Sequence, residues 1–202
     1  MPKINYANIL KKELARIENE NIKPRLLLHV CCAPCSSYVL EYLQNHFDIT
    51  VYFYNPNISP ESEYEFRKNE LKRLIKEMCN DEIRYIDADY NPQVFFSAVK
   101  GLENEPEGKK RCEVCFNLRL ESTAKVAKEL NFDYFTTTLS ISPLKNAELL
   151  NTIGENLAKK YDTRYLFSDF KKNEGYKRSI ELSKEYDLYR QEYCGCVFSK
   201  NK

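Results

Sequence analysis

Long hydrophobic runs are missing from the sequence, and no stretch approaches the length of a membrane span. The N-terminal residues are charged where a secretory signal has an apolar segment, so the sequence predicts a cytoplasmic protein with no membrane partner. The same feature, with a length of 202 residues, disfavours a secreted disulfide framework. Repeats and low-complexity segments are also missing from the sequence. We therefore expect one α/β metalloenzyme domain over 1–202.

Glycine is scarce, with five residues in the chain, and no glycine-rich SGGxDS loop for a pyrophosphate follows the first predicted strand. Its absence counts against ATP as a cofactor. The net charge of +1 favours no class of partner by itself. Basic residues nevertheless gather near the cysteines, which predicts a surface for an anionic partner at Lys109, Lys110, Arg111, Lys171 and Lys172.

Cysteine, by contrast, is plentiful, and seven of the eight residues fall into three short groups. The groups are Cys31-Cys32-Ala-Pro-Cys35, Cys112-Glu-Val-Cys115 and Cys194-Gly-Cys196, whereas Cys79 stands alone in a predicted helix. Thiolates are soft metal ligands, and a short spacing lets one loop supply two of them. An iron–sulfur cluster or a structural zinc needs four thiolates, so seven indicate a metal together with reactive thiols.

The hydrophobic pattern alternates between strands and helices. Short apolar runs predict strands over 25–30, 48–55, 82–90, 132–140 and 163–170. Helical spacing predicts an N-terminal helix within 1–22 and further helices over 38–46, from about 60 to 79, and over 92–101, 112–130 and 142–161, with a last helix and the Cys-Gly-Cys tail in 170–202. Ser36 and Ser37 are the expected caps of the second helix. The alternation is typical of an α/β, Rossmann-like fold in which helices flank a parallel sheet.

This architecture places the candidate chemistry at one edge of the sheet. Ligands of open α/β sheets bind beyond the carboxyl ends of the strands, and the first cysteine group follows the first strand directly. The segment 138–146 and Asp169 follow later strands, so we expect a metal site at this C-terminal edge. Helix N-termini there lower thiol pKa values. Gly195 allows Cys194 and Cys196 either to aim both sulfurs inward or to close a small disulfide.

Five motifs in a fixed order resemble one known family, the cobalamin-independent epoxyqueuosine reductases. They are LLLHVCCAPC at 26–35, YNPNI at 54–58, RCEVCFNLRL at 111–120, TLSISPLKN at 138–146 and the segment 169–196. The resemblance implies a fold like that of the adenine nucleotide alpha-hydrolases (HUP-like), a 4Fe-4S cluster and an adjacent mononuclear iron or zinc. It also implies reduction of the epoxide of epoxyqueuosine at the wobble position of tRNA, the last step to queuosine.

Site residues follow from the same resemblance. It implies cluster ligands at Cys31, Cys32, Cys112 and Cys115, a further metal ligand at Cys35, and a redox-active, disulfide-forming pair at Cys194 and Cys196. Removing the epoxide oxygen as water takes two electrons and two protons, but one 4Fe-4S cluster passes one electron at a time, so a second redox store is expected. The external electron donor stays open.

Other polar residues are candidates from position alone. Asp169 at a strand end and Tyr193 beside the tail are candidate proton donors, whereas His29 is expected to be packed structure. Lys145 and Arg119 are candidates for binding tRNA phosphate. Two rival functions remain, namely a tRNA sulfur transferase of a PP-loop-like fold and a zinc-binding nucleic-acid-binding module. The brown colour of an iron–sulfur protein would separate them from the reductase.

Overall fold

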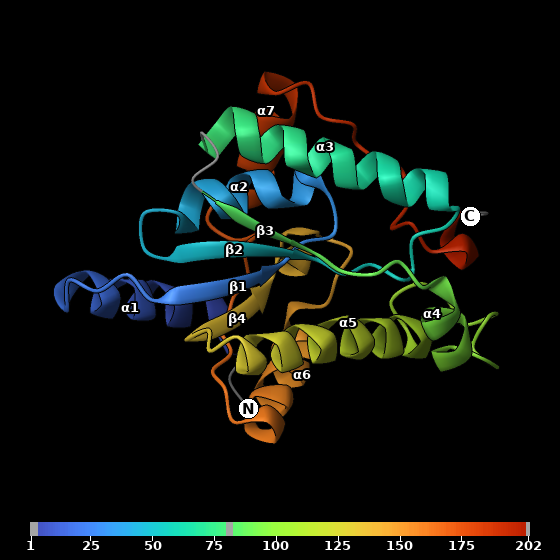
Figure 1. The fold of residues 1–202 in the computed structure, drawn as a ribbon, viewed down its shortest axis with the longest axis horizontal. Coiled ribbons are helices and arrows are strands. Elements are labelled where there is room, and N and C mark those ends of the chain that lie inside the picture. The colour runs from blue at the N-terminus through green and yellow to red at the C-terminus, as the bar shows by residue number, and fades with distance from the viewer. Residues whose placement is uncertain (1–3, 80–82, 201–202) are drawn as a thin grey trace.

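The computed structural model describes residues 4–79 and 83–200. Its four strands are all parallel and lie in the order β3-β2-β1-β4 (Figure 1). They are β1 (Arg25–His29), β2 (Asp48–Phe53), β3 (Arg84–Asp87) and β4 (Tyr134–Thr137). The predicted α/β fold with a parallel sheet between helices is confirmed, while the likeness to the nucleotide hydrolases stays a prediction. Glu82, the first residue of one predicted strand, lies outside the described residues.

The strand order reverses between β1 and β4. The chain moves outward from β1 to β2 and β3, and then returns to place β4 on the other side of β1. Leu28 of β1 pairs with Val51 of β2 and also with Thr136 of β4, so β1 is the central strand of this reversal. Folds of this kind bind ligands at such a reversal, beyond the carboxyl ends of the strands, which here are those of β1 and β4.

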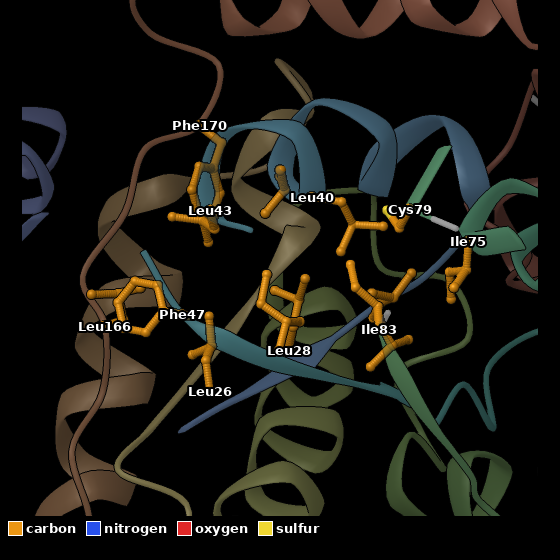
Figure 2. Close-up of a cluster of buried hydrophobic side chains, with 14 of the residues drawn as sticks. Leu26, Leu28, Leu40, Leu43, Phe47, Ile75, Cys79, Ile83, Leu166 and Phe170 are labelled. Atoms are coloured by element: carbon orange, nitrogen blue, oxygen red, sulfur yellow. The ribbon is translucent and has the colours of Figure 1, made fainter. Parts of the chain in front are cut away.

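Side chains of β1 alternate between the two faces of the sheet, as the period of a strand requires. Leu26 and Leu28 pack in the cluster of Figure 2 with α2 (Ala33–Leu43) and α3 (Glu61–Cys79). Leu27 points the other way, into a second cluster with α5 (Lys110–Glu129) and α6 (Ala147–Tyr161). Figure 1 shows these two layers on opposite sides of the sheet.

The remaining elements complete the layers. They are α1 (Tyr6–Asn19), α4 (Pro92–Ala98), α7 (Gly175–Glu185) and two 3₁₀ turns, η1 (Thr138–Ile141) and η2 (Val197–Ser199). α7 packs on α2, and α4 packs on α5. Among the described residues, no helix combines the length and the apolar character that crossing a membrane requires.

The predicted strand over 163–170 is wrong. Its backbone makes a single bridge to the sheet, between Tyr165 and Phe135. Further along, the side-chain amide of Asn151 accepts from the Ser168 N–H at 2.9 Å and donates to the Ser168 carbonyl at 2.8 Å. Because a side chain of α6 satisfies these backbone groups, they are not available for pairing with β4.

The predicted capping role of Ser36 and Ser37 is also wrong. α2 begins at Ala33, with Cys32 in the N-cap position and a proline in the first turn, where a missing N–H costs nothing. Both hydroxyls donate backward to carbonyls at 3.0 Å, Ser36 to that of Cys32 and Ser37 to that of Pro34. The first cysteine group is therefore part of the helix start and not a loop before it.

Candidate active site

A cavity of about 210 Å³ lies at the C-terminal edge of the sheet. Its wall combines residues that follow β1 and β4 with residues of α5 and of the C-terminal tail. Six cysteines line it, namely Cys31, Cys35, Cys112, Cys115, Cys194 and Cys196. All three cysteine groups therefore meet at one site, at the edge of the sheet where the sequence places the first of them.

The first group forms a compact set of three thiols. The sulfurs of Cys31, Cys32 and Cys35 all lie within 4.8 Å of one another, close enough to ligate a single metal ion. Cys31 follows β1, Cys32 is the N-cap of α2 and Cys35 stands on its first turn. The Cys32 sulfur lies 3.7 Å from that of Cys31 and accepts a hydrogen bond of 2.8 Å from the side-chain amide of Gln191.

The second group lies at the start of α5. Cys112 and Cys115 are one turn apart, both are buried, and both line the cavity. The N–H of Gly108 donates to the Cys112 sulfur at 3.1 Å. Arg111, directly before this group, was expected on a tRNA surface, and this is wrong. It is buried, and its guanidinium donates to the carbonyls of Leu102, Glu103 and Glu105, so it fastens the loop before α5.

The Cys-Gly-Cys tail is fixed against the loop after β2. The N–H of Ser59 donates to the Gly195 carbonyl at 3.0 Å, and the Asn57 amide donates to the Cys194 carbonyl at 3.4 Å. Gly195 has φ +96°, and a Cβ there would lie 2.7 Å from Cγ1 of Ile58. The disulfide expected between Cys194 and Cys196 is absent, and both residues are thiols.

Several residues that support the site were not predicted from the sequence. Asn55 donates to the Val30 carbonyl at 2.9 Å and accepts from Arg119 at 2.5 Å, so it ties the loop after β2 to the end of β1. Buried Arg67 pairs with Glu63 at 2.6 Å and donates to the Tyr193 carbonyl at 3.3 Å. The motif YNPNI at 54–58 was the available signal, because its polar residues follow a strand at the edge where the cysteines lie.

The candidate acid–base residues separate into two kinds. Lys145 and Tyr193 line the cavity, and the Lys145 ammonium pairs with Glu107 on the opposite loop at 3.2 Å. His29 does not line it; its imidazole is buried between Thr137, the Tyr54 carbonyl and Arg119, which confirms a packed histidine. Asp169 pairs with Lys171 at 2.8 Å, away from the cavity wall.

Comparison with known proteins adds the family. The sequence profile described as "Epoxyqueuosine reductase QueH" matches residues 26–202. The chain belongs to this family. A relative of that name from Streptococcus pyogenes serotype M1 is 49% identical over 200 residues, which cover 98% of this chain and 78% of that protein. Another from Staphylococcus aureus is 46% identical over 202 residues (98% and 84%), and one from Thermotoga maritima is 38% identical over 177 residues (86% and 89%).

In this member of the QueH family, the first and the third cysteine groups each contain one thiol with a lowered pKa, Cys31 and Cys194. Hydrogen bonds from Cys32 and Cys35 hold the pKa of the Cys31 thiol well below its usual range, although burial opposes them. A hydrogen bond from Cys196 and the charge of Lys145 likewise lower the pKa of Cys194, again against burial. In each of these groups, a hydrogen bond from a neighbouring thiol therefore favours the thiolate form of one sulfur.

The thiols of α5 and the buried histidine have different environments. Burial raises the pKa of the Cys115 thiol to about 11. Burial and, to a smaller extent, the positive charge of Arg119 lower the pKa of His29 to about 3. His29 is therefore neutral near pH 7. Arg119 itself is buried, donates to Asn55 and lines the cavity, which makes it a fixed positive charge beside the thiols. Its expected role on tRNA phosphate does not fit this burial.

Proposed function

We propose that this chain reduces the epoxide of epoxyqueuosine at the wobble position of tRNA to give queuosine, and that the epoxide reacts in the thiol cavity. The observation that carries the proposal is the meeting of six thiols from three distant segments at one cavity, in a chain of the QueH family. Opening the epoxide to an alkene with loss of water consumes two electrons and two protons. A cavity lined by thiols suits such a reduction.

The donor set fits an iron–sulfur cluster and a second metal. In the proposal, Cys31, Cys32, Cys112 and Cys115 hold a 4Fe-4S cluster, and Cys35 is a ligand of an adjacent iron or zinc. Soft sulfur donors, two buried cysteines on α5 and the fixed charge of Arg119 support it, because a thiolate-bound cluster is an anionic group. When bound, these groups would pass single electrons and polarise the epoxide oxygen as a Lewis acid.

The protein supplies the remaining chemistry through its own side chains. Cys194 and Cys196 are the redox-active thiols of the proposal, and the lowered pKa of Cys194 supports this role for its sulfur. Lys145 holds a proton on the cavity wall. Burial disfavours its charged form, but the Cys194 thiolate and Glu107 outweigh burial and raise the pKa of Lys145. Asp169 as a catalytic group stays a prediction, and the external electron donor is not assigned.

Metal analysis of anaerobically purified protein, combined with an activity assay, tests the proposal. The wild type should contain about four iron and four sulfide per chain, and it should convert epoxyqueuosine in tRNA to queuosine when given an artificial reductant. Cys112→Ala should lose iron, sulfide and activity together, while Cys79→Ala, at the end of α3 and outside the cavity, should keep all three. A Cys112→Ala protein with full iron and sulfide content would contradict the ligand set.

The two rival functions are not favoured. A sulfur transferase that uses ATP needs a glycine-rich loop between the first strand and its helix, and in this chain Cys31, Cys32 and the start of α2 occupy that position. A zinc module without chemistry would saturate four thiols with metal and leave no reason for the further thiols on the same cavity.

A further inference from the structure

An exposed apolar rim borders the thiol cavity. Leu144 exposes 74% of its surface, the largest fraction of any large hydrophobic side chain among the described residues. Together with its neighbour Pro143 it lines the cavity, and so does Tyr176 of α7, which is 36% exposed. A scattered exposed leucine is normal, but an apolar group gathered at the mouth of a reactive cavity marks a binding surface.

Leu144 is held in this exposed position by a hydrogen-bonded turn. The N–H of Leu144 donates to the Ser142 hydroxyl at 3.3 Å, and the N–H of Lys145 donates to the Ser142 carbonyl at 3.1 Å. The Lys171 ammonium donates to the Lys145 carbonyl at 3.5 Å and so ties the turn to the segment before α7. The exposure of Leu144 is therefore set by the fold.

The charges beside the rim favour a polyanion as the occupant. Four exposed cations on the cavity wall or on the segments that contribute to it form no ion pair with any described residue, namely Lys109, Lys110, Lys172 and Arg190. Of the acids on the wall, Glu107 is neutralised by Lys145, which leaves Glu192. An RNA loop offers phosphates for these cations and base faces for the apolar rim, whereas an apolar peptide would leave the cations without counter-charge.

Access to the thiols requires a base to leave its stack. None of the six thiols on the cavity wall is exposed and three of them are buried, so a base that remains between its neighbours in the anticodon loop cannot bring its epoxide to them. We propose that Leu144 is a wedge that takes the place of the target base in the stack, and that Tyr176 is the platform on which the extruded base stacks. This inference rests on the proposed function, since it concerns the same cavity.

Binding of a fluorescent anticodon stem-loop tests the wedge without any chemistry. The probe carries 2-aminopurine beside the wobble position, where fluorescence rises when the neighbouring base leaves the stack. The wild type should bind with a fluorescence increase. Leu144→Ala and Tyr176→Ala should weaken binding about tenfold each and give a smaller increase at saturation. Tyr176→Phe should match the wild type, because the stacking ring is kept.

Leu130→Ala is the matched control, because Leu130 is 46% exposed but lies beyond the end of α5, where Arg25 at the start of β1 contacts its carbonyl. It should match the wild type in affinity and in fluorescence. Wild-type affinity and fluorescence in both alanine variants, or binding by the wild type without any fluorescence increase, would overturn the inference. Conversion of epoxyqueuosine by the wild type is measured separately and does not depend on this result. A failure of the wedge inference can therefore be distinguished from a failure of the proposed function.

Discussion

The side-chain amide of Gln191 donates a hydrogen bond of 2.8 Å to the sulfur of Cys32. Gln191 belongs to the C-terminal tail, three positions before Cys194, whereas Cys32 is the N-cap of α2. This contact joins the tail to the first cysteine group across the cavity wall. Binding of a metal to the Cys32 sulfur changes its strength as a hydrogen-bond acceptor, so we expect the contact with Gln191 to respond to the state of Cys32.

If Cys32 is a ligand of the proposed cluster, Gln191→Leu should lower the reduction potential of that cluster. A hydrogen bond to a ligand sulfur stabilises the added negative charge of the reduced cluster, so its loss makes reduction harder. One hydrogen bond contributes about 1 kcal/mol, which corresponds to a shift on the order of tens of millivolts for one electron. A redox titration followed by electron paramagnetic resonance measures the shift. Gln93→Leu on exposed α4 should leave the potential unchanged, and an equal potential in both variants would contradict the tuning role.

Cys196→Ala should make the Cys194 thiol less acidic. The hydrogen bond from Cys196 is the largest cause of the lowered pKa of Cys194, so its removal raises this pKa and reduces the thiolate fraction at neutral pH. Alkylation of Cys194 by iodoacetamide, followed by peptide mass spectrometry, should slow about tenfold for each unit of the rise, and its pH profile should move to higher pH. Lys145→Met should act in the same direction, because the ammonium also favours the thiolate. Unchanged profiles in both variants would exclude the thiolate assignment.

The layers of the fold could be predicted because burial leaves a direct pattern in the sequence. Leu26, Leu27 and Leu28 are all buried, since helices cover both faces of a parallel sheet, and such a run is recognisable without a structure. The segment 163–170 has a similar composition, yet it is not a sheet strand. What decides its state is the amide of Asn151 on another helix, a long-range contact that no local pattern contains.

The sequence could predict only those parts of the candidate site whose residues are close together along the chain. Neighbouring cysteines must lie together, which gives the three groups, and the end of the first strand places the first group at the ligand-binding edge of the sheet. The place of the tail depends on contacts of Cys194 and Gly195 with the loop after β2, more than 130 residues earlier in the chain. The prediction that Arg111 lies on a tRNA surface was wrong for a related reason, because a run of basic residues does not reveal which of them is buried.

Reversing the charge of two lysines beside the cavity should weaken tRNA binding and should reduce the salt dependence of that binding. Lys109 and Lys110 are exposed at the start of α5, next to wall residues of the cavity. If each contacts a phosphate, the slope of log affinity against log salt should fall by about 0.7 to 0.9 per lost contact in Lys109→Glu/Lys110→Glu. The control is Lys11→Glu/Lys12→Glu, an exposed pair on α1, which Figure 1 places away from α5. Equal slopes for the two variants would leave Lys109 and Lys110 outside the interface.

Gly195→Ala should remove activity while it preserves most of the stability. The residue has φ +96°, which costs about 1–3 kcal/mol for alanine, and the new Cβ would lie 2.7 Å from Cγ1 of Ile58, 3.2 Å from a guanidinium nitrogen of Arg67 and 3.3 Å from Cα of Ile58. The backbone of Ile58 and the buried side chain of Arg67 cannot both move away from the new Cβ. The tail itself should therefore shift and carry Cys194 and Cys196 off the cavity wall.

Gly101→Ala separates this clash from the backbone strain. Gly101 has φ +83°, and a Cβ added there would meet no atom within 4 Å, so alanine suffers the same conformational cost without displacing a neighbour. Both variants should therefore lose free energy of unfolding in urea, Gly195→Ala the more because of its clash, and both should keep their iron, because neither changes a proposed ligand. Only Gly195→Ala should fail to convert epoxyqueuosine in tRNA at a temperature where both are folded. Equal turnover by the two variants would show that the reaction does not need the tail sulfurs in their observed place.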